Sequence, residues 1–395
     1  MKNVYALLLS ALLFATSCGD NSNSPEDVIP GVAKKPLKAL IVSGWHQSTK
    51  PQMDLINFEG DSLYRSNIFE YINGSALEGT VNAITVDGNY IYMACSDKNM
   101  LYVLDKETFK KVNSISFGND FSPSKVTILT DGRAVVTGTF VVTSWDVSTG
   151  ETIYIVTNPT SPSHTIEKVY VDDSSDVIET KEVKQVGDKL FVEIPSYSKW
   201  LGGYDFENVP AQIFCYDIDN IATGKHRVVA EGFTLASTND NFITDAKGTI
   251  WVIGEEQGTT TLAKLNANEE TLSDKVQLNS ISGVYLTGFA LSFKGDELYV
   301  RSQKSIYAIS TNNPTDPFEP IAAINGNITG SSQFFDISGL MVDTNGKVQV
   351  LTTISGSSEK GYMFEFTPSE DGSSWGEPVV HFDIVPHGKF MVDVR

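Results

Sequence analysis

The chain alternates apolar and polar residues over short runs, most clearly between Val81 and Phe117. Half-buried β-strands show this alternation because successive side chains point to opposite faces of a sheet. Asp87-Gly88 separates the first two runs and suits a tight hairpin turn, because glycine accepts the positive φ that such turns need. We therefore predict four consecutive strands: Val81–Val86, Tyr90–Ala94, Met100–Asp105 and Lys110–Phe117.

This four-run pattern recurs along the chain. The further copies are Lys125–Val156, Val177–Gly232, Asn241–Leu278, Gly288–Ile324 and Ile337–Ile384. In the first of these copies, Trp145-Asp146 is expected to end the third strand. The copy Val177–Gly232 is enlarged by the loop Ser196–Gln212, between its second and third strands. Four-strand repeats of roughly 40 residues predict a β-propeller rather than a sandwich.

Both ends of the chain carry parts of one more unit. Ala39–Ser43, Gln52–Phe58 and Ser62–Tyr71 have the pattern of second, third and fourth strands, and Lys389–Val394 has that of a first strand. Joined, they would form a seventh blade and leave no sheet edge exposed. We therefore predict an all-β, seven-bladed β-propeller over residues 37–395, with four antiparallel strands per blade. The C-terminal strand would close the ring by joining the N-terminal strands.

The N-terminus has the features of a bacterial export signal. Lys2 precedes the apolar run Ala6–Ala15, and Ala15-Thr-Ser-Cys18 matches a lipobox, in which the cysteine is acylated and becomes the mature N-terminus. An ordinary signal peptide with a chance cysteine is the alternative. We predict a lipoprotein signal peptide over residues 1–17, lipidation at Cys18 and a flexible tether over residues 18–36. The protein would then be an outer-membrane lipoprotein, facing either the cell surface or the periplasm.

Charge and cysteine content narrow the possible partners. The 49 acidic residues outnumber the 29 basic ones, which gives a formal net charge of −20, and a surface of this sign does not suit nucleic acid. Apart from Cys18, the chain has only Cys95 and Cys215. We interpret them as buried free thiols, with a disulfide between blades as the alternative. No Cys/His spacing indicates a metal site, and no cofactor is predicted.

Part of the sequence resembles a known family. The matching residues are Ser66-Asn-Ile-Phe69, Asn73-Gly74, Leu77, Asn82 and Gly88-Asn-Tyr-Ile-Tyr92. They resemble a signature of YncE-like seven-bladed propeller lipoproteins of Bacteroidetes, and the similarity is clearest over residues 38–160. The resemblance implies an exported lipoprotein, often found beside a TonB-dependent transporter. Some relatives capture corrinoids. The family defines no catalytic motif, so the resemblance assigns no catalytic residue.

Aromatic and histidine residues gather in loops that should share one face of the propeller. In a four-stranded blade, the loop between strands two and three lies on the same face as the connection to the next blade. We predict that this face binds a ligand, because rings stack on flat or sugar-like molecules while their polar edges form hydrogen bonds. The alternative is that the rings cap the blade ends. The candidate ligand-binding residues are Trp45, His46, Phe121, Tyr197, Trp200, Tyr204, Phe335 and His387.

Three functions fit these patterns. The chain lacks a Gly-x-Ser-x-Gly elbow and a metal-ligand pattern, so we predict no catalytic residues. We favour an envelope binding module that captures a small molecule or glycan, with an outer-membrane transporter as a possible partner. A propeller enzyme of the polysaccharide lyase or hydrolase type, or a protein-interaction scaffold, are the alternatives.

Overall fold

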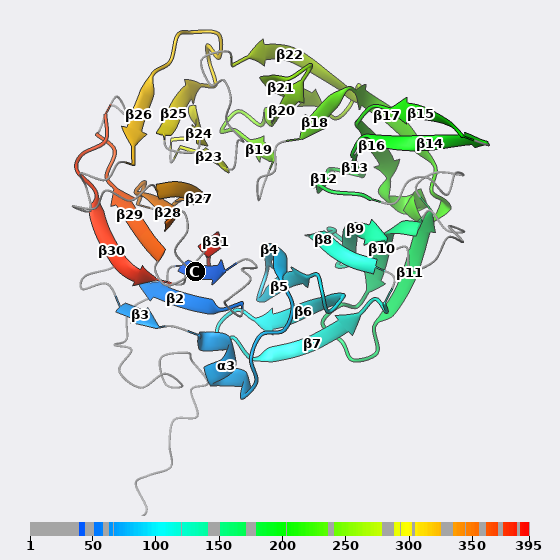
Figure 1. Ribbon diagram of the computed structural model, residues 1–395, viewed down its shortest axis with the longest axis horizontal. Helices are drawn as coiled ribbons and strands as arrows, with labels where there is room; N and C mark the ends of the chain where they lie inside the picture. Colours follow the sequence, from blue (N-terminus) through cyan, green and yellow to red (C-terminus); the bar gives the residue numbers. More distant parts are fainter. Residues whose placement is uncertain are drawn as a thin grey trace, which may run out of the picture.

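The computed structural model shows small antiparallel β-sheets arranged in a ring (Figure 1). It describes residues 39–43, 51–57, 63–65, 67–119, 121–140, 151–170, 179–202, 204–235, 241–278, 288–292, 294–301, 305–324, 335–343, 345–354, 361–369, 374–384 and 388–394. Within these residues, six sheets have four strands, one has five, and a two-stranded hairpin forms a separate sheet. The predicted all-β architecture with four-stranded antiparallel blades is confirmed.

The sheet of β4 to β7 reproduces the pattern from which the fold was predicted. Its strands are β4 (Val81–Asp87), β5 (Tyr90–Cys95), β6 (Met100–Asp105) and β7 (Lys111–Ser116). Asp87 pairs directly with Tyr90, so Gly88 and Asn89 form the turn between the first two strands. Gly88 has a φ of 55°, in the left-handed region that glycine tolerates best.

Four more sheets repeat this up-and-down order. The first contains β8 (Phe121–Ile128), β9 (Ala134–Phe140), β10 (Glu151–Thr157) and β11 (Thr165–Tyr170). The second contains β12 (Val183–Val186), β13 (Lys189–Ile194), β16 (Gln212–Asp217) and β17 (His226–Glu231), with a 3-10 helix η1 (Ile218–Thr223) before its last strand. The third contains β23 (Gly288–Leu291), β24 (Glu297–Arg301), β25 (Ser305–Ser310) and β26 (Pro320–Ala323). The fourth contains β27 (Phe335–Val342), β28 (Val348–Ile354), β29 (Gly361–Phe366) and β30 (Val379–Ile384).

The strand assignment within Lys125–Val156 was wrong. The third strand of this sheet is β10, which begins at Glu151, so it cannot end at Trp145-Asp146. The sheet continues to Tyr170 through β11. The apolar run after Glu151 has its side chains from Ile153 to Val156 buried, as a strand between two others requires. Trp145 lies outside the described residues.

The five-stranded sheet arises because its first strand is split. β18 (Phe233–Leu235) and β19 (Phe242–Thr244) both pair with β20 (Ile250–Glu256), which is followed by β21 (Thr259–Asn266) and β22 (Thr271–Gln277). Phe233 lies opposite Glu256 at one end of β20, and Phe242 lies opposite Val252 nearer its other end. The described residues therefore form six four-stranded sheets rather than the seven expected from the sequence.

The two ends of the described chain share one sheet. It contains β1 (Ala39–Ser43), β2 (Met53–Asn57), β3 (Leu63–Arg65) and β31 (Gly388–Asp393), and β31 pairs with β1 on the side opposite β2. Ala39 lies directly opposite Asp393. The strand expected over Ser62–Tyr71 was wrong beyond Arg65.

A short helix replaces the second half of that expected strand. α3 (Ile68–Asn73) begins after Asn67, which has a φ of 53°, and ends at Gly74, which has a φ of 67°. Both caps adopt the left-handed conformation, which asparagine and glycine accept more readily than other residues. The helix buries Ile68 and Phe69 in the core. The Asn73 amide donates to the carbonyl oxygens of Phe69 and Phe109.

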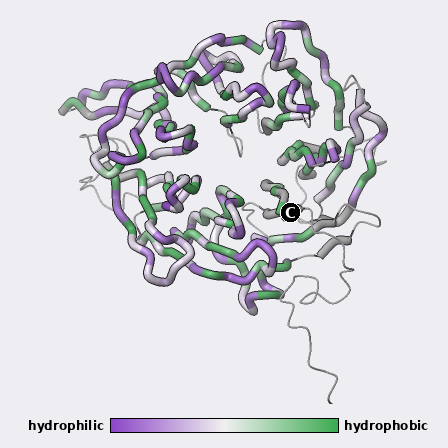
Figure 2. The backbone as a smooth tube through the Cα atoms, turned by 180° about the vertical axis from the view of Figure 1, so that it is seen from behind, coloured by the Kyte–Doolittle hydropathy of each residue, from purple (hydrophilic) through white to green (hydrophobic). Residues whose placement is uncertain are grey.

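The core lies between neighbouring sheets. Trp251 and Ile253 of β20 pack with Leu298 and Val300 of β24 in one buried cluster, and similar clusters occupy other sheet interfaces. Figure 2 shows how hydrophobic and hydrophilic positions alternate along the strands. This packing excludes apolar surface from water, which is the main stabilising contribution in a fold of this kind.

Cys95 and Cys215 are both buried free thiols, so that interpretation is confirmed and the disulfide between them is excluded. Burial raises the pKa of both thiols, that of Cys215 to about 11. Neither cysteine is therefore a thiolate near neutral pH. Among the described helices, none is long and apolar enough to cross a bilayer.

Candidate functional site

The structure describes some of the predicted ligand-binding residues and not others. Cys18, Trp45, His46 and His387 lie outside the described residues. Trp200 lies in the hairpin strand β14 (Tyr197–Gly202), and Phe335 begins β27, the first strand of its sheet.

Phe121 is a core residue. Its side chain is fully buried, and its ring centroid lies 5.5 Å from that of Phe117 and 4.2 Å from that of Tyr154. A Cβ atom on Gly138 would lie 2.7 Å from the Phe121 ring, so the glycine provides the space that the ring occupies. We therefore correct the expectation that Phe121 faces a ligand.

The same arrangement recurs in the five-stranded sheet. Phe233 is also fully buried, and a Cβ atom on Gly254 would lie 2.5 Å from its ring. In both sheets, the phenylalanine is the first residue of the first strand, and it lies against a glycine near the end of the strand that pairs with it. A phenylalanine with such a glycine partner belongs to the core, whereas the sequence alone led us to place Phe121 in a ligand-binding loop.

The enlarged loop forms an exposed β-hairpin. β14 pairs with β15 (Asp205–Val209), and the two strands form a sheet of their own. Figure 1 shows the hairpin projecting beyond the outer edge of the ring. Tyr204 at its turn is 99% exposed, Phe206 is 62% exposed and Leu201 is 61% exposed. Large side chains with this exposure are typical of interaction surfaces.

The hairpin brings three of the predicted residues together. Tyr197, Trp200 and Tyr204 all belong to it or to its turn. Tyr197 is half-buried and packs against the core of the adjoining sheet, so it anchors the hairpin. Trp200 lies directly opposite Phe206 in the register of the two strands. Phe206 belongs to the same exposed hairpin, although it is not one of the ligand-binding residues predicted from the sequence.

A buried polar network links three sheets near the inner strands. Lys125 of β8 forms an ion pair with Glu182, with 3.2 Å between Nζ and Oε2. The Asn241 amide donates to the same Glu182 oxygen at 3.1 Å. Glu182 directly precedes β12, and Asn241 directly precedes β19. The carboxylate of Glu182 therefore connects its own sheet to both neighbours.

Glu193 is the second carboxylate of this region. It is 2% exposed, and its Oε1 accepts a hydrogen bond of 2.9 Å from the backbone N–H of Leu235 in β18. Burial raises the pKa of Glu193 to about 7, against the opposing effects of the Leu235 hydrogen bond and the Lys181 charge. One feature of the sequence indicates that Glu193 is unusual: it interrupts the otherwise apolar run from Leu190 to Ile194.

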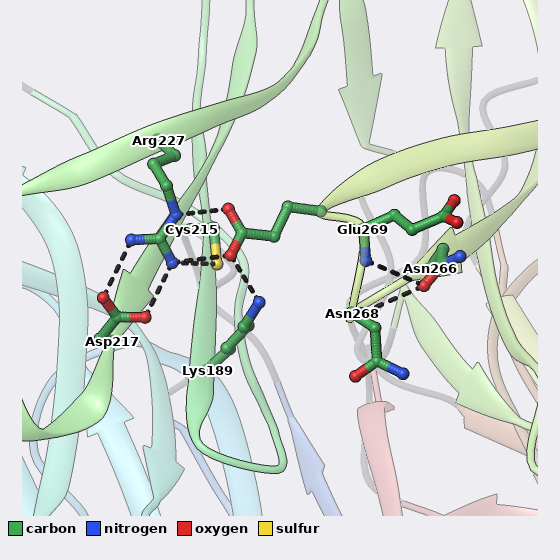
Figure 3. Close-up of polar contacts among 8 residues, drawn as sticks. Lys189, Cys215, Asp217, Arg227, Asn266, Asn268 and Glu269 are labelled. Atoms are coloured by element: carbon green, nitrogen blue, oxygen red, sulfur yellow. Dashed lines mark hydrogen bonds and ion pairs between the residues drawn. The ribbon is translucent and has the colours of Figure 1, made fainter.

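A second network ties two sheets together through Arg227 (Figure 3). The Arg227 guanidinium binds both oxygens of Asp217, at 2.8 and 3.0 Å, and also pairs with Glu270 of the neighbouring sheet. Lys189 reaches the same Glu270 carboxylate. The hydrogen bonds from Arg227 and Lys189 lower the pKa of Glu270 to about 2. Two cations and two anions balance here, which indicates a structural contact between sheets rather than a ligand site.

Metal ligands do not converge in the part of the chain that the structure describes: it holds no group of three or more His, Cys, Asp or Glu side chains able to bind an ion. The strongest candidate site on the described surface is the hairpin of β14 and β15, because it carries the most exposed large hydrophobic side chains.

Comparison with solved structures shows the fold. A putative 6-phosphogluconolactonase from Bacteroides fragilis matches with a TM-score of 0.56 and 12% identity, over 92% of this chain and 99% of that one. A quinoprotein alcohol dehydrogenase-like protein from Bacteroides thetaiotaomicron matches with a TM-score of 0.54 and 14% identity, over 91% of each chain. A protein from Lactobacillus plantarum matches with a TM-score of 0.52 and 10% identity, over 91% of this chain and 99% of that one.

This chain is a β-propeller. The identities to these proteins are low, so the similarity carries the fold and not the activity of any of them. No known family model matches the chain, and no curated protein matches its sequence. Membership of the YncE-like lipoproteins of Bacteroidetes stays a prediction from the residues between Ser66 and Tyr92.

Proposed function

We propose that this β-propeller is an envelope-anchored binding protein that captures a small molecule or a glycan with its projecting hairpin. The observation that carries the proposal is the exposure of Leu201 on β14, Tyr204 in the turn and Phe206 on β15. The hairpin is an insertion between the second and third strands of its sheet, and insertions in repeat folds often form the binding surface. Exposed apolar side chains that gather in one place commonly mark an interaction site.

The ring itself is the proposed scaffold for this hairpin. We count the five-stranded sheet as one blade, which gives seven blades, and we assign the closure of the ring to the pairing of β31 with β1. In a closed ring each blade packs against a neighbouring blade on both faces. It would therefore hold the hairpin in a fixed position, and a fixed binding surface loses less conformational entropy when a ligand binds.

The proposed anchor is the acylated Cys18, joined to the propeller by the tether over residues 18–36. The protein would then be an outer-membrane lipoprotein, on the cell surface or the periplasmic face, and could pass its ligand to a TonB-dependent transporter. Cys18→Ala is expected to leave the protein soluble and without fatty acid, because the acyl chains supply the membrane affinity. Fractionation of both proteins tests this. A variant that still partitions with membranes as the wild type does would contradict the anchor.

A double substitution tests ligand capture. Tyr204→Ala with Phe206→Ala is expected to abolish binding of whichever corrinoid or glycan the wild type retains, and to leave the melting temperature almost unchanged, because both rings are largely exposed. Isothermal titration calorimetry and a thermal melt measure the two effects. If the variant folds and still binds the ligand with wild-type affinity, the site lies elsewhere. If it unfolds, the rings are part of the core.

An enzymatic function is less well supported. A carboxyl group with a pKa of about 7, as at Glu193, suits general acid–base catalysis. At 2% exposure, however, the Glu193 carboxyl does not reach a substrate in this structure, and its hydrogen bond to Leu235 joins two sheets. We therefore assign Glu193 to the packing of blades and keep the binding function.

A further inference from the structure

We infer that the hairpin of β14 and β15 recognises an uncharged glycan rather than an acidic one. This inference rests on the proposed function, because it names the class of ligand for the same hairpin. It depends on how the two strands distribute their side chains, on the hydrogen-bonding groups beside Phe206, and on the charges that flank this ring along the chain.

The register separates neutral from charged residues. Ser198 lies opposite Asn208, and Lys199 lies opposite Glu207. Because successive residues of a strand alternate between faces, Ser198, Asn208 and Phe206 belong to one face of the hairpin, and Lys199 and Glu207 belong to the other. We call the first of these the neutral face.

The neutral face points away from the propeller body. Tyr197 and its partner Val209, on the opposite face, are half-buried, and Tyr197 packs against the core. Ser198 and Asn208 are exposed, and Phe206 is 62% exposed. A ligand can therefore reach the neutral face without any movement of the ring.

The groups on the neutral face match the chemistry of a sugar. A pyranose ring has a flat apolar side of C–H groups, which stacks on an aromatic ring such as Phe206, and a rim of hydroxyl groups. The Asn208 amide can both donate and accept hydrogen bonds, and so can the Ser198 hydroxyl. The Ser198 hydroxyl donates a hydrogen bond of 3.4 Å to Asn208 Oδ1, so the two groups are close enough for one sugar hydroxyl to contact both. No charged residue is needed for this recognition.

Charge disfavours an acidic glycan at the same place. Asp205 and Glu207 are the chain neighbours of Phe206 and both are exposed. Against these two acidic residues the described hairpin has one basic residue, Lys199, which lies opposite Glu207, so the hairpin carries more negative than positive charge. The whole chain carries a formal net charge of −20. A uronate or sialate bound on Phe206 would therefore approach a hairpin and a chain that are both negatively charged on balance, which disfavours its binding.

A glycan array with neutral, sialylated and uronate-containing members tests the inference with the full propeller. We expect binding to neutral members, reduced at least about tenfold by Phe206→Ala, which corresponds to about 1.4 kcal/mol. Asn208→Ala should weaken binding as well. Tyr71→Ala is the matched control, because Tyr71 is an exposed aromatic residue of α3, far along the chain from the hairpin, and it should bind as the wild type does.

A charge variant separates the two parts of the argument. Asp205→Asn with Glu207→Gln is expected to retain neutral glycans and to gain affinity for acidic ones, most strongly at low salt. If the wild type binds acidic glycans as well as neutral ones, the inference is wrong while the binding function stands. The inference also fails, with the function intact, if a corrinoid binds through Tyr204 and Phe206 and no glycan does. If neither class binds, both fail.

Discussion

Replacing Glu193 with glutamine should make the protein less sensitive to alkaline pH. Glu193 has a pKa of about 7 in the folded state, raised from 4.5 by burial. Below pH 4.5 the carboxyl is protonated in both the folded and the unfolded chain, so it costs nothing. Between these values the unfolded chain releases its proton first, and above pH 7 the folded state bears the full cost of a buried charge.

The expected size of the effect follows from this shift in pKa. Each unit corresponds to about 1.4 kcal/mol, so the ionised Glu193 destabilises the folded state by about 3 kcal/mol at the alkaline limit. From about pH 5 to about pH 8.5, the free energy of unfolding of the wild type should fall by about 2 to 3 kcal/mol relative to that of Glu193→Gln. The glutamine keeps an oxygen that can accept the hydrogen bond from Leu235.

Urea unfolding of both proteins at these two pH values, followed by tryptophan fluorescence, measures the difference. Comparing two pH values removes the constant effect of the new amide, because that effect does not titrate. Glu207→Gln is the control, since Glu207 is exposed on the hairpin. Parallel stability curves for the wild type and Glu193→Gln would refute the argument, and so would an equal pH effect in the control.

Three further predictions concern the core, the shared sheet and the contact around Arg227. Trp251→Ala should cost about 3–5 kcal/mol in chemical unfolding, because Trp251 is fully buried and donates to Asp245; a loss under about 1 kcal/mol would show that the site collapses freely. Removing residues 388–395 should lower the melting temperature of the whole domain, because it unpairs β1; an unchanged melt would contradict this. Glu270→Gln should destabilise the protein at neutral pH. The difference should shrink as pH falls from 4.5 towards 2, where the wild-type carboxylate itself becomes protonated, and a difference that persists in acid unfolding would rule out the ion pairs as its cause.

The sequence predicted those strands whose burial alternates or whose turns are marked by glycine. The turn marked by Gly88 is one example, although it consists of Gly88 and Asn89 because Asp87 is still paired in β4, and the apolar run from Leu190 to Ile194 is another. The helix α3 was not predicted because the pattern of a short run such as Ile68–Asn73 fits both a strand and a helix. Only the capping residues distinguish the two. Gly74 was the available signal for the C-terminus of a helix.

The candidate site was less predictable than the fold. The alternation of apolar and polar residues predicts which side chains are buried, but not which blade they contact. The hydrogen bond between Glu193 and Leu235 could therefore not be predicted from the sequence. For the same reason, Phe121 was predicted to lie in a loop, whereas its ring packs against Gly138. The enlarged loop was visible in the sequence as an interruption of the repeat, but its pairing as β14 and β15 needed the register of the two strands.

The sheet that joins β31 to β1 also bears on how the molecule is made. Ala39 and Asp393 are paired neighbours in space although they lie near opposite ends of the described chain. While the ribosome is still synthesising the chain, β1 has emerged and its partner has not, so one side of β1 remains open until Gly388–Asp393 has been synthesised. An open strand can pair with the wrong chain. One edge of this sheet is therefore exposed to wrong pairing for longer than an edge in any described sheet that is built from consecutive strands.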